Sequence, residues 1–138
     1  MKLIGIDYGR RRIGIAVTDE NGEYIRGLPT LDRNKFPDYV PLLVSLIEKE
    51  LPRRIVIGLP LDINGDDTVM SKEVRLFAAR LETLAGVAVT FVDESLSSVE
   101  AAALMRFRKK KDRRRKDAVD RVAACLILEA FQKGLTCA

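Results

Sequence analysis

Apolar residues alternate with small or polar ones over the first 28 residues, a pattern typical of β-strands. Residues 2–8 predict one strand and residues 12–18 a second, joined by a tight turn. Asn21-Gly22 predicts another hairpin turn, because Asn-Gly supplies the positive φ that two-residue hairpins need, and a third strand over residues 23–28 follows it. The pattern therefore predicts three antiparallel strands at the start of the chain.

Helical spacing begins after a predicted loop at residues 29–37. Apolar residues three and four apart predict a helix that begins near Val40 and that Pro52 ends. The apolar run at residues 54–58 is typical of a parallel strand covered on both faces. Residues 59–68 then read as a loop.

Four further elements complete the predicted order. Apolar spacing predicts a helix over residues 70–86, and residues 87–92 predict a fifth strand. A capping box predicts a short helix over residues 97–105, and a last helix ends at Gly134. The order βββαβαβαα predicts an α/β fold: a five-stranded mixed sheet, with three antiparallel strands and then βα units, and helices on both faces.

Length and composition fit one domain spanning residues 1–138, since 47% of the residues are hydrophobic and can fill a single core. No stretch approaches the roughly 18 apolar residues that span a bilayer, and Met1-Lys2 leads into a strand rather than an export signal. We expect a cytoplasmic protein with no membrane contact. Cys125 and Cys137 are expected to be free thiols, which fits a reducing compartment.

The chain contains no histidine. This excludes Ser-His-Asp hydrolysis, paired-histidine ribonuclease chemistry, metalloprotease sites with two histidines, and zinc modules built on cysteine and histidine. Any hydrolysis must therefore rest on carboxylates and on metals bound by oxygen.

The net charge of +4 conceals a strongly basic segment. Residues 106–116 hold nine of the 24 lysines and arginines and one of the 20 acidic residues, so the rest of the chain is acidic overall. A local positive segment on an acidic protein attracts a polyanion to one place. We expect a basic, flexible loop that contacts nucleic acid; a solvated run of charge with no partner is the alternative.

Asp7 is a charged residue within a predicted buried strand. Burial of an unpaired carboxylate costs several kcal/mol unless a metal or a partner compensates the charge. We therefore expect Asp7 to have a functional role. The alternative is that its carboxylate accepts hydrogen bonds from the turn at residues 9–11.

Two other places offer acids that could join Asp7. Asp93 and Glu94 end the fifth strand, and only one of them can share a site with Asp7 because side chains alternate along a strand. Asp117 and Asp120 lie three residues apart at the start of the last helix and can face one ligand. The alternative is an acid that interacts favourably with the dipole at the start of a helix, which could explain one of Asp93 and Glu94 but not both, and Asp117 more readily than Asp120.

Three or four carboxylates without histidine suit Mg²⁺ or Mn²⁺, which prefer oxygen ligands. Small residues at Ala118, Ala123 and Ala124 would let the last helix approach the sheet closely, as a shared site requires. Two ions roughly 3.5 to 4 Å apart can activate a water and stabilise the leaving oxygen in attack on a phosphodiester. The acids therefore predict a two-metal nuclease site.

Four motifs resemble the YqgF family, also called RuvX, of RNase H-like proteins. They are Gly5-Ile6-Asp7-Tyr8-Gly9 with residues 14–17, Ile57-Gly58-Leu59-Pro60, Asp93-Glu94, and residues 119–128, in that order along nearly the whole chain. The resemblance implies an RNase H-like fold and a cytoplasmic bacterial endonuclease in 5′-end maturation of pre-16S rRNA, with ribosomal precursor particles as partners. It matches Asp7, Glu94 and Asp120 to catalytic metal ligands, and Asp117 to a fourth acid of the related RuvC-type Holliday junction resolvases.

The chain departs from this family at two places. Ser95 stands where the family usually has an arginine, a change that concerns substrate contact rather than metal binding. The loop at residues 58–65 corresponds to the family's loop over the active site, and the asparagine and aspartate usual there are exchanged as Asp62 and Asn64.

Basic residues supply the expected contacts with nucleic acid. They are Arg10, Arg11, Arg12, Arg108, Lys109, Lys110, Lys111, Arg113, Arg114, Arg115 and Lys116. Phe107 is the only aromatic residue in the basic segment, so we expect contact with the phosphate backbone rather than stacking on bases. Pre-rRNA is the expected partner, with branched DNA as the alternative, since junction resolution needs the same acids and basic surface.

Two other classes of protein fit less well. Actin-like and sugar-kinase ATPases also begin with a strand, an aspartate and a glycine, but here three arginines follow, and 138 residues cannot form two lobes around a nucleotide. A non-catalytic RNA-binding module, in which the acids are structural, is the remaining alternative.

Overall fold

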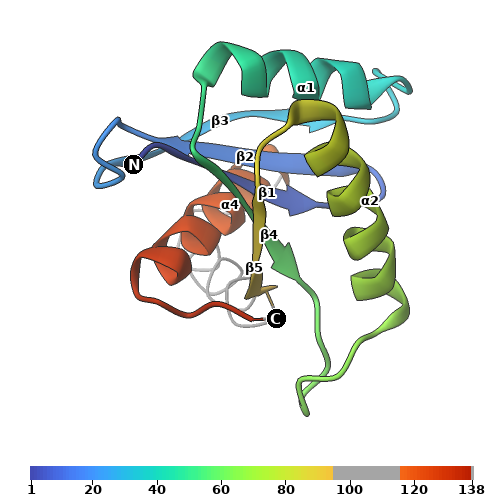
Figure 1. Ribbon diagram of the computed structural model, residues 1–138. Coiled ribbons are helices and arrows are strands. Elements are labelled where there is room, and N and C mark those ends of the chain that lie inside the picture. The colour runs from blue at the N-terminus through green and yellow to red at the C-terminus, as the bar shows by residue number, and fades with distance from the viewer. Residues whose placement is uncertain (95–115, 138) are drawn as a thin grey trace.

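The computed structural model describes residues 1–94 and 116–137 (Figure 1). Its elements are β1 (Leu3–Tyr8), β2 (Arg12–Thr18), β3 (Ile25–Asp32), α1 (Tyr39–Glu50), β4 (Arg54–Leu59), α2 (Val69–Ala85), β5 (Val89–Asp93) and α4 (Lys116–Gln132). The predicted helix over residues 97–105 lies outside the described residues. Each of the other predicted elements is present, and none of the described helices has the length and apolar character needed to span a membrane.

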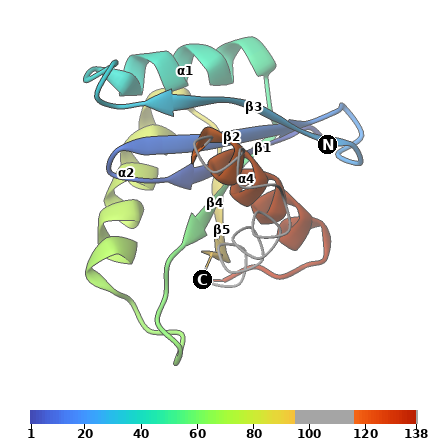
Figure 2. The same ribbon diagram turned by 180° about the vertical axis from the view of Figure 1, so that it is seen from behind.

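The strands form one mixed sheet in the order β3-β2-β1-β4-β5. β1 pairs antiparallel with β2, and β2 with β3, whereas β4 pairs parallel with β1 and with β5. Helices cover both faces: α1 and α2 pack on one, and α4 lies across the strands on the other, as the view from behind shows (Figure 2). The predicted α/β architecture is confirmed.

β3 is longer than predicted, because the expected loop after Leu28 continues as strand to Asp32. Ile13 of β2 pairs with Leu31 and Ile15 with Leu28, so a bulge accommodates Pro29. A proline lacks an N–H for the ladder, but an edge strand tolerates one at a bulge. Proline at this position therefore did not end the strand.

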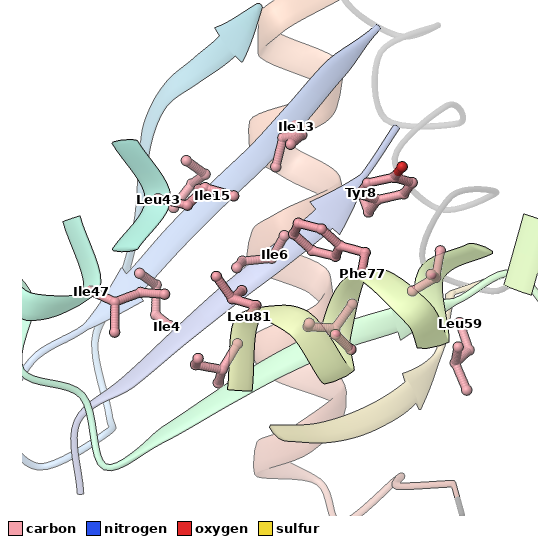
Figure 3. Packing of buried hydrophobic residues seen from close by; sticks show 14 of the residues in the cluster. Ile4, Ile6, Tyr8, Ile13, Ile15, Leu43, Ile47, Leu59, Phe77 and Leu81 are labelled. Atoms are coloured by element: carbon pink, nitrogen blue, oxygen red, sulfur yellow. The ribbon is translucent and has the colours of Figure 1, made fainter. Parts of the chain in front are cut away.

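The two faces of the sheet carry different side chains. Ile4, Ile6 and Tyr8 of β1 point into the larger core, which lies between the sheet and helices α1 and α2 (Figure 3). Leu3 of the same strand belongs to a smaller cluster under α4. Asp7, which alternates with Ile6 and Tyr8, consequently faces α4.

Candidate active site

Asp7 stands in a row across the sheet between two glycines. It pairs with Gly14 of β2. On its other side Ile6 pairs with Ile57 of β4, so the next residue, Gly58, flanks Asp7. Residues that pair across neighbouring strands share a face of the sheet, so all three face α4. The glycines leave space for other groups beside the Asp7 carboxylate.

The space above Gly14 is filled by Asp120 of α4. A Cβ on Gly14 would lie 2.3 Å from the Asp120 carbonyl oxygen and 3.2 Å from the Asp120 Cβ. Residue 14 must therefore lack a side chain if α4 is to lie this close to the sheet. Ala124, one turn further along α4, is fully buried and its carbonyl oxygen lies 3.0 Å from the equivalent position on Gly5. The predicted close approach of the helix is confirmed.

The space above Gly58 is filled by Glu94. A Cβ on Gly58 would lie 2.8 Å from the Glu94 Cβ and 3.0 Å from its carboxyl carbon. Glu94 is only 5% exposed. Gly58 also pairs with Val92, which packs in the cluster under α4. Glu94 therefore lies on the same face as Asp7.

Asp93 lies on the opposite face, because it follows Val92 in the strand. Burial, and then the charge of Asp93, raise the pKa of the Cys137 thiol, which packs against the larger core. Of the two adjacent acids, the structure thus brings Glu94 and not Asp93 to the face of Asp7.

Burial and a second acid both act on the Asp7 carboxyl. Burial is the larger cause, and the negative charge of Asp120 adds to it; together they raise the pKa of Asp7 from 3.8 to about 7. A carboxylate held this way gains from a nearby cation, because the cation compensates the lost hydration. The unfavourable burial of negative charge thus occurs at the position where the sequence predicts the site.

The arginines of the first turn have partners in this structure. Arg12 Nε donates to Asp120 Oδ2 at 3.2 Å, and Arg10 Nε donates to Glu73 Oε1, also at 3.2 Å. Arg11 is exposed. All three were predicted to contact nucleic acid, and that role stays a prediction. The structure adds that Arg12 reaches the candidate site itself.

A network behind the site was not predicted. Arg33 Nη1 donates to the Tyr8 hydroxyl at 3.2 Å and to the Gly9 carbonyl oxygen at 3.0 Å, and its guanidinium lies over the Tyr39 ring at 4.4 Å. The Tyr8 hydroxyl donates to Glu73 Oε2 at 2.9 Å. Burial and this bond to Glu73 raise the pKa of Tyr8 to about 12. No spacing in the sequence joins these residues, since they come from separate elements.

The remaining predicted groups are placed only in part. Asp117 and Lys116 lie in the first turn of α4, and residues 108–115 lie outside the described residues. In the loop after β4, Asp62 Oδ1 accepts hydrogen bonds from the backbone N–H groups of Asn64 and Asp66, both at 2.9 Å. The exchanged aspartate thus stabilises its own loop.

The donor chemistry fits a hard divalent cation. Asp7, Glu94 and Asp120 offer oxygens, and the two glycines let Asp120 and Glu94 pack against the strands on either side of Asp7. Within residues 1–94 and 116–137, no three acidic or thiol side chains stand close enough together to hold one ion. The predicted ligand set therefore stays a prediction, with Asp7 and Asp120 as its coupled pair.

Comparison with known proteins supports the same interpretation. Residues 1–133 match the family model RuvX, described as Holliday junction resolvase. A protein of Crocosphaera subtropica is 39% identical over 131 residues, 95% of this chain and 92% of that protein, and one of Koribacter versatilis is 41% identical over 94% and 85%; both are named "Putative pre-16S rRNA nuclease".

Solved structures share the fold. Thermus thermophilus RuvC in complex with Holliday junction substrate aligns with a TM-score of 0.61 at 16% identity, covering 99% of this chain and 98% of that one. The Fowlpox virus Holliday junction resolvase aligns with a TM-score of 0.54 at 11% identity, covering 98% and 100%. The RNase H-like fold expected from the motifs is confirmed.

Proposed function

The chain belongs to the RuvX family of nucleases, and on that premise we propose that it is a metal-dependent endonuclease that hydrolyses phosphodiester bonds in 5′-end maturation of pre-16S rRNA. One observation carries the proposal: Asp7 lies between two glycines, and each glycine accommodates one of the other two predicted acids. Residues 1–138 act here as one nuclease domain.

Asp7 is the central ligand in this proposal. Asp120 lies on its β2 side and Glu94 on its β4 side, and these two acids would complete the ligand set of a cation bound at Asp7. Asp117, three residues before Asp120 in α4, is a fourth candidate. When bound, Mg²⁺ or Mn²⁺ supplies a water activated for attack and charge stabilisation for the leaving oxygen. The acids would hold that cation in place beside Asp7.

The relatives named for pre-16S rRNA favour RNA as the substrate. The basic segment at residues 106–116 binds phosphates of the RNA or of a ribosomal precursor particle. Contacts with phosphates contribute affinity but little sequence specificity. Neutralising Lys109 to Lys111 and Arg113 to Arg115 should weaken binding and flatten its salt dependence. An unchanged salt slope would show that the segment is only a solvated run of charge.

Junction resolution is the second candidate function, favoured by the description of the family model. Cutting two strands of a four-way junction symmetrically needs a second copy of the chain. A single copy suffices for trimming RNA. Oligomeric state together with substrate preference therefore separates the two functions.

The test compares cleavage of a pre-16S rRNA 5′ fragment with cleavage of a four-way DNA junction, in Mg²⁺ or Mn²⁺, by the native chain and by Asp7→Asn. We expect cleavage of the RNA and its loss, by about 10³-fold, in Asp7→Asn, as for removal of a group that stabilises transition-state charge. Cleavage that survives Asp7→Asn undiminished would sink the proposal. Binding without cleavage by the native chain would indicate a non-catalytic RNA-binding module.

A further inference from the structure

Strand β2 contacts Asp120 twice. Gly14 admits the backbone of Asp120, and Arg12, two residues earlier on the same face of the strand, forms an ion pair with its carboxylate. The two side chains are 26% and 23% exposed, respectively, so the pair is largely shielded from solvent. Two contacts therefore position Asp120: its backbone packs closely against Gly14, and its carboxylate pairs with the Arg12 guanidinium.

The ion pair differs from the one beside it in the same turn. Arg10 and Glu73 are 65% and 36% exposed, and exposed pairs of this kind contribute little. The Arg12 pair lies next to a second carboxylate, Asp7, whose charge is coupled to that of Asp120. The Arg12 guanidinium thus pairs with one of two acids whose negative charges repel each other.

A guanidinium in this position can compensate negative charge at the site, as a metal ion would. It compensates negative charge that burial leaves poorly hydrated, and it does so through an oxygen of one of the predicted ligands. A divalent cation bound to the Asp120 carboxylate would therefore lie close to a fixed positive charge. The two cations repel each other and compete for Asp120.

We propose that Arg12 is the built-in counter-ion of Asp120 and that it weakens binding of the divalent cation at the candidate site. Arg12 acts through Asp120 and is a positioning residue, not a catalytic one. It keeps Asp120 paired in the metal-free protein and restrains α4 against β2. The inference rests on the proposed function in one respect, that Asp120 ligates the cation.

The test is a titration of the full-length protein with Mn²⁺, in which free Mn²⁺ is measured by electron paramagnetic resonance. Arg12→Gln should bind Mn²⁺ about five- to tenfold more tightly than the native chain, because it removes a unit charge acting on a divalent ion across roughly 6 Å. Arg12→Lys keeps the charge and should stay within about twofold of native. Arg11→Gln is the matched control: it removes the same charge from the adjacent, exposed position and should also stay within about twofold.

A double-mutant cycle assigns the effect to the pair. In an Asp120→Asn background, Arg12→Gln should change the Mn²⁺ affinity by less than twofold, because the carboxylate that Arg12 neutralises is gone. Thermal unfolding in a chelator supplies an independent reading. Arg12→Gln should lower the melting temperature of the metal-free protein, and saturating Mn²⁺ should restore more stability to this variant than to the native chain.

The outcomes separate this inference from the proposed function. Equal or weaker Mn²⁺ binding by Arg12→Gln, with Asp7→Asn and Asp120→Asn both weakened, would overturn the counter-ion role and leave the metal site standing. Mn²⁺ binding unaffected by Asp7→Asn and Asp120→Asn would overturn the metal site of the proposed function, and with it this inference. Tighter binding confined to Arg12→Gln supports both.

Discussion

On the face of the sheet covered by α1 and α2, strand β1 presents Ile4, Ile6 and Tyr8 to a large apolar core. On the face covered by α4, the same strand presents Gly5 and Asp7, with an alanine and two acids packed against them and their neighbours. The first face gains stability from apolar burial. The second buries a smaller apolar cluster and gives the rest of its area to glycines and carboxylates.

The comparison shows how one strand can serve stability and chemistry at once. A period of two assigns successive residues to opposite faces, so a functional residue can sit between two core residues without disturbing either. On the α4 face, Gly5 and Gly14 lie where the helix approaches the sheet most closely, and charged residues lie at the candidate site. A substitution should therefore have opposite consequences on the two faces.

The largest expected effect comes from adjacent positions on opposite faces, Ile6 and Asp7. Ile6→Ala removes a fully buried side chain and should lower the free energy of unfolding by about 2–5 kcal/mol, while the activity of each folded molecule stays within a few-fold of native. Asp7→Asn should abolish cleavage and leave the metal-free protein as stable as native, or more so. Urea unfolding in a chelator, combined with cleavage rates below the transition, measures both.

The opposite pattern, loss of activity in Ile6→Ala and loss of stability in Asp7→Asn, would contradict the division of roles between the two faces. Loss of activity in folded Ile6→Ala would mean that the core face takes part in the chemistry. A large loss of stability in metal-free Asp7→Asn would mean that Asp7 is a structural acceptor for the turn at residues 9–11. The hydrogen bonds from Arg33 to Tyr8 and Gly9 already hold that turn without Asp7.

The adjacent acids Asp93 and Glu94 provide the second prediction. Glu94→Gln removes a predicted ligand beside Asp7 and should lower the cleavage rate by about 100-fold, whereas Asp93→Asn, on the opposite face, should change it by less than about twofold. Both variants remove one negative charge from the end of β5, so each controls for the other. A larger effect from Asp93→Asn would place the site on the wrong face.

Much of this arrangement could be predicted from the sequence. The strands, the helix over residues 70–86 and the position of Asp7 in a buried strand could be predicted from the spacing of apolar residues. Asp93 and Glu94 could be assigned to opposite faces but not ranked, because the exact end of β5 decides which one turns towards Asp7. Pro29 was interpreted as a loop signal, since edge position and bulges appear only once the strands are paired.

Contacts between distant elements could not be predicted. Arg12 and Asp120 are 108 residues apart, and the three arginines of the turn are alike in composition; only the packing of α4 on Gly14 separates Arg12 from the others. The glycines could be recognised in the sequence motifs, but the group that packs against each one is known only from the three-dimensional arrangement. The role of Arg33 could not be recognised in the sequence, because its partners belong to other elements of the fold.

Gly58→Ala is the third prediction and tests the close packing directly. The new Cβ would meet Glu94 Cβ and Ile127 Cδ1, both at 2.8 Å, so Glu94 and α4 must shift. Overpacking of this kind costs about 1–3 kcal/mol, and displacement of Glu94 should lower the cleavage rate by about tenfold. Gly65→Ala is a poor control because Gly65 has a φ of 82°. Ala78→Gly on the opposite face is a better one: it should cost stability with no loss of activity per folded molecule.

The smallest expected effect is a pH dependence that belongs to the α4 face alone. The pKa of Asp7 is raised in the folded protein to about 7, so the folded state binds a proton that the unfolded chain, with a pKa near 3.8, has lost. The stability this proton provides is complete below pH 3.8 and is lost as the pH rises through about 7. In a chelator, the stability of Asp7→Asn should therefore rise relative to native between pH 5 and pH 7, by about 2 kcal/mol. Urea unfolding at several pH values measures the difference.

Asp120→Asn should keep most of the native dependence of stability on pH, because burial is the larger cause of the raised pKa of Asp7 and the charge of Asp120 is the smaller. A difference that does not change with pH would mean that Asp7 is better hydrated than its place between Gly14 and Gly58 implies, and the contrast between the two faces would then rest on shape rather than on charge.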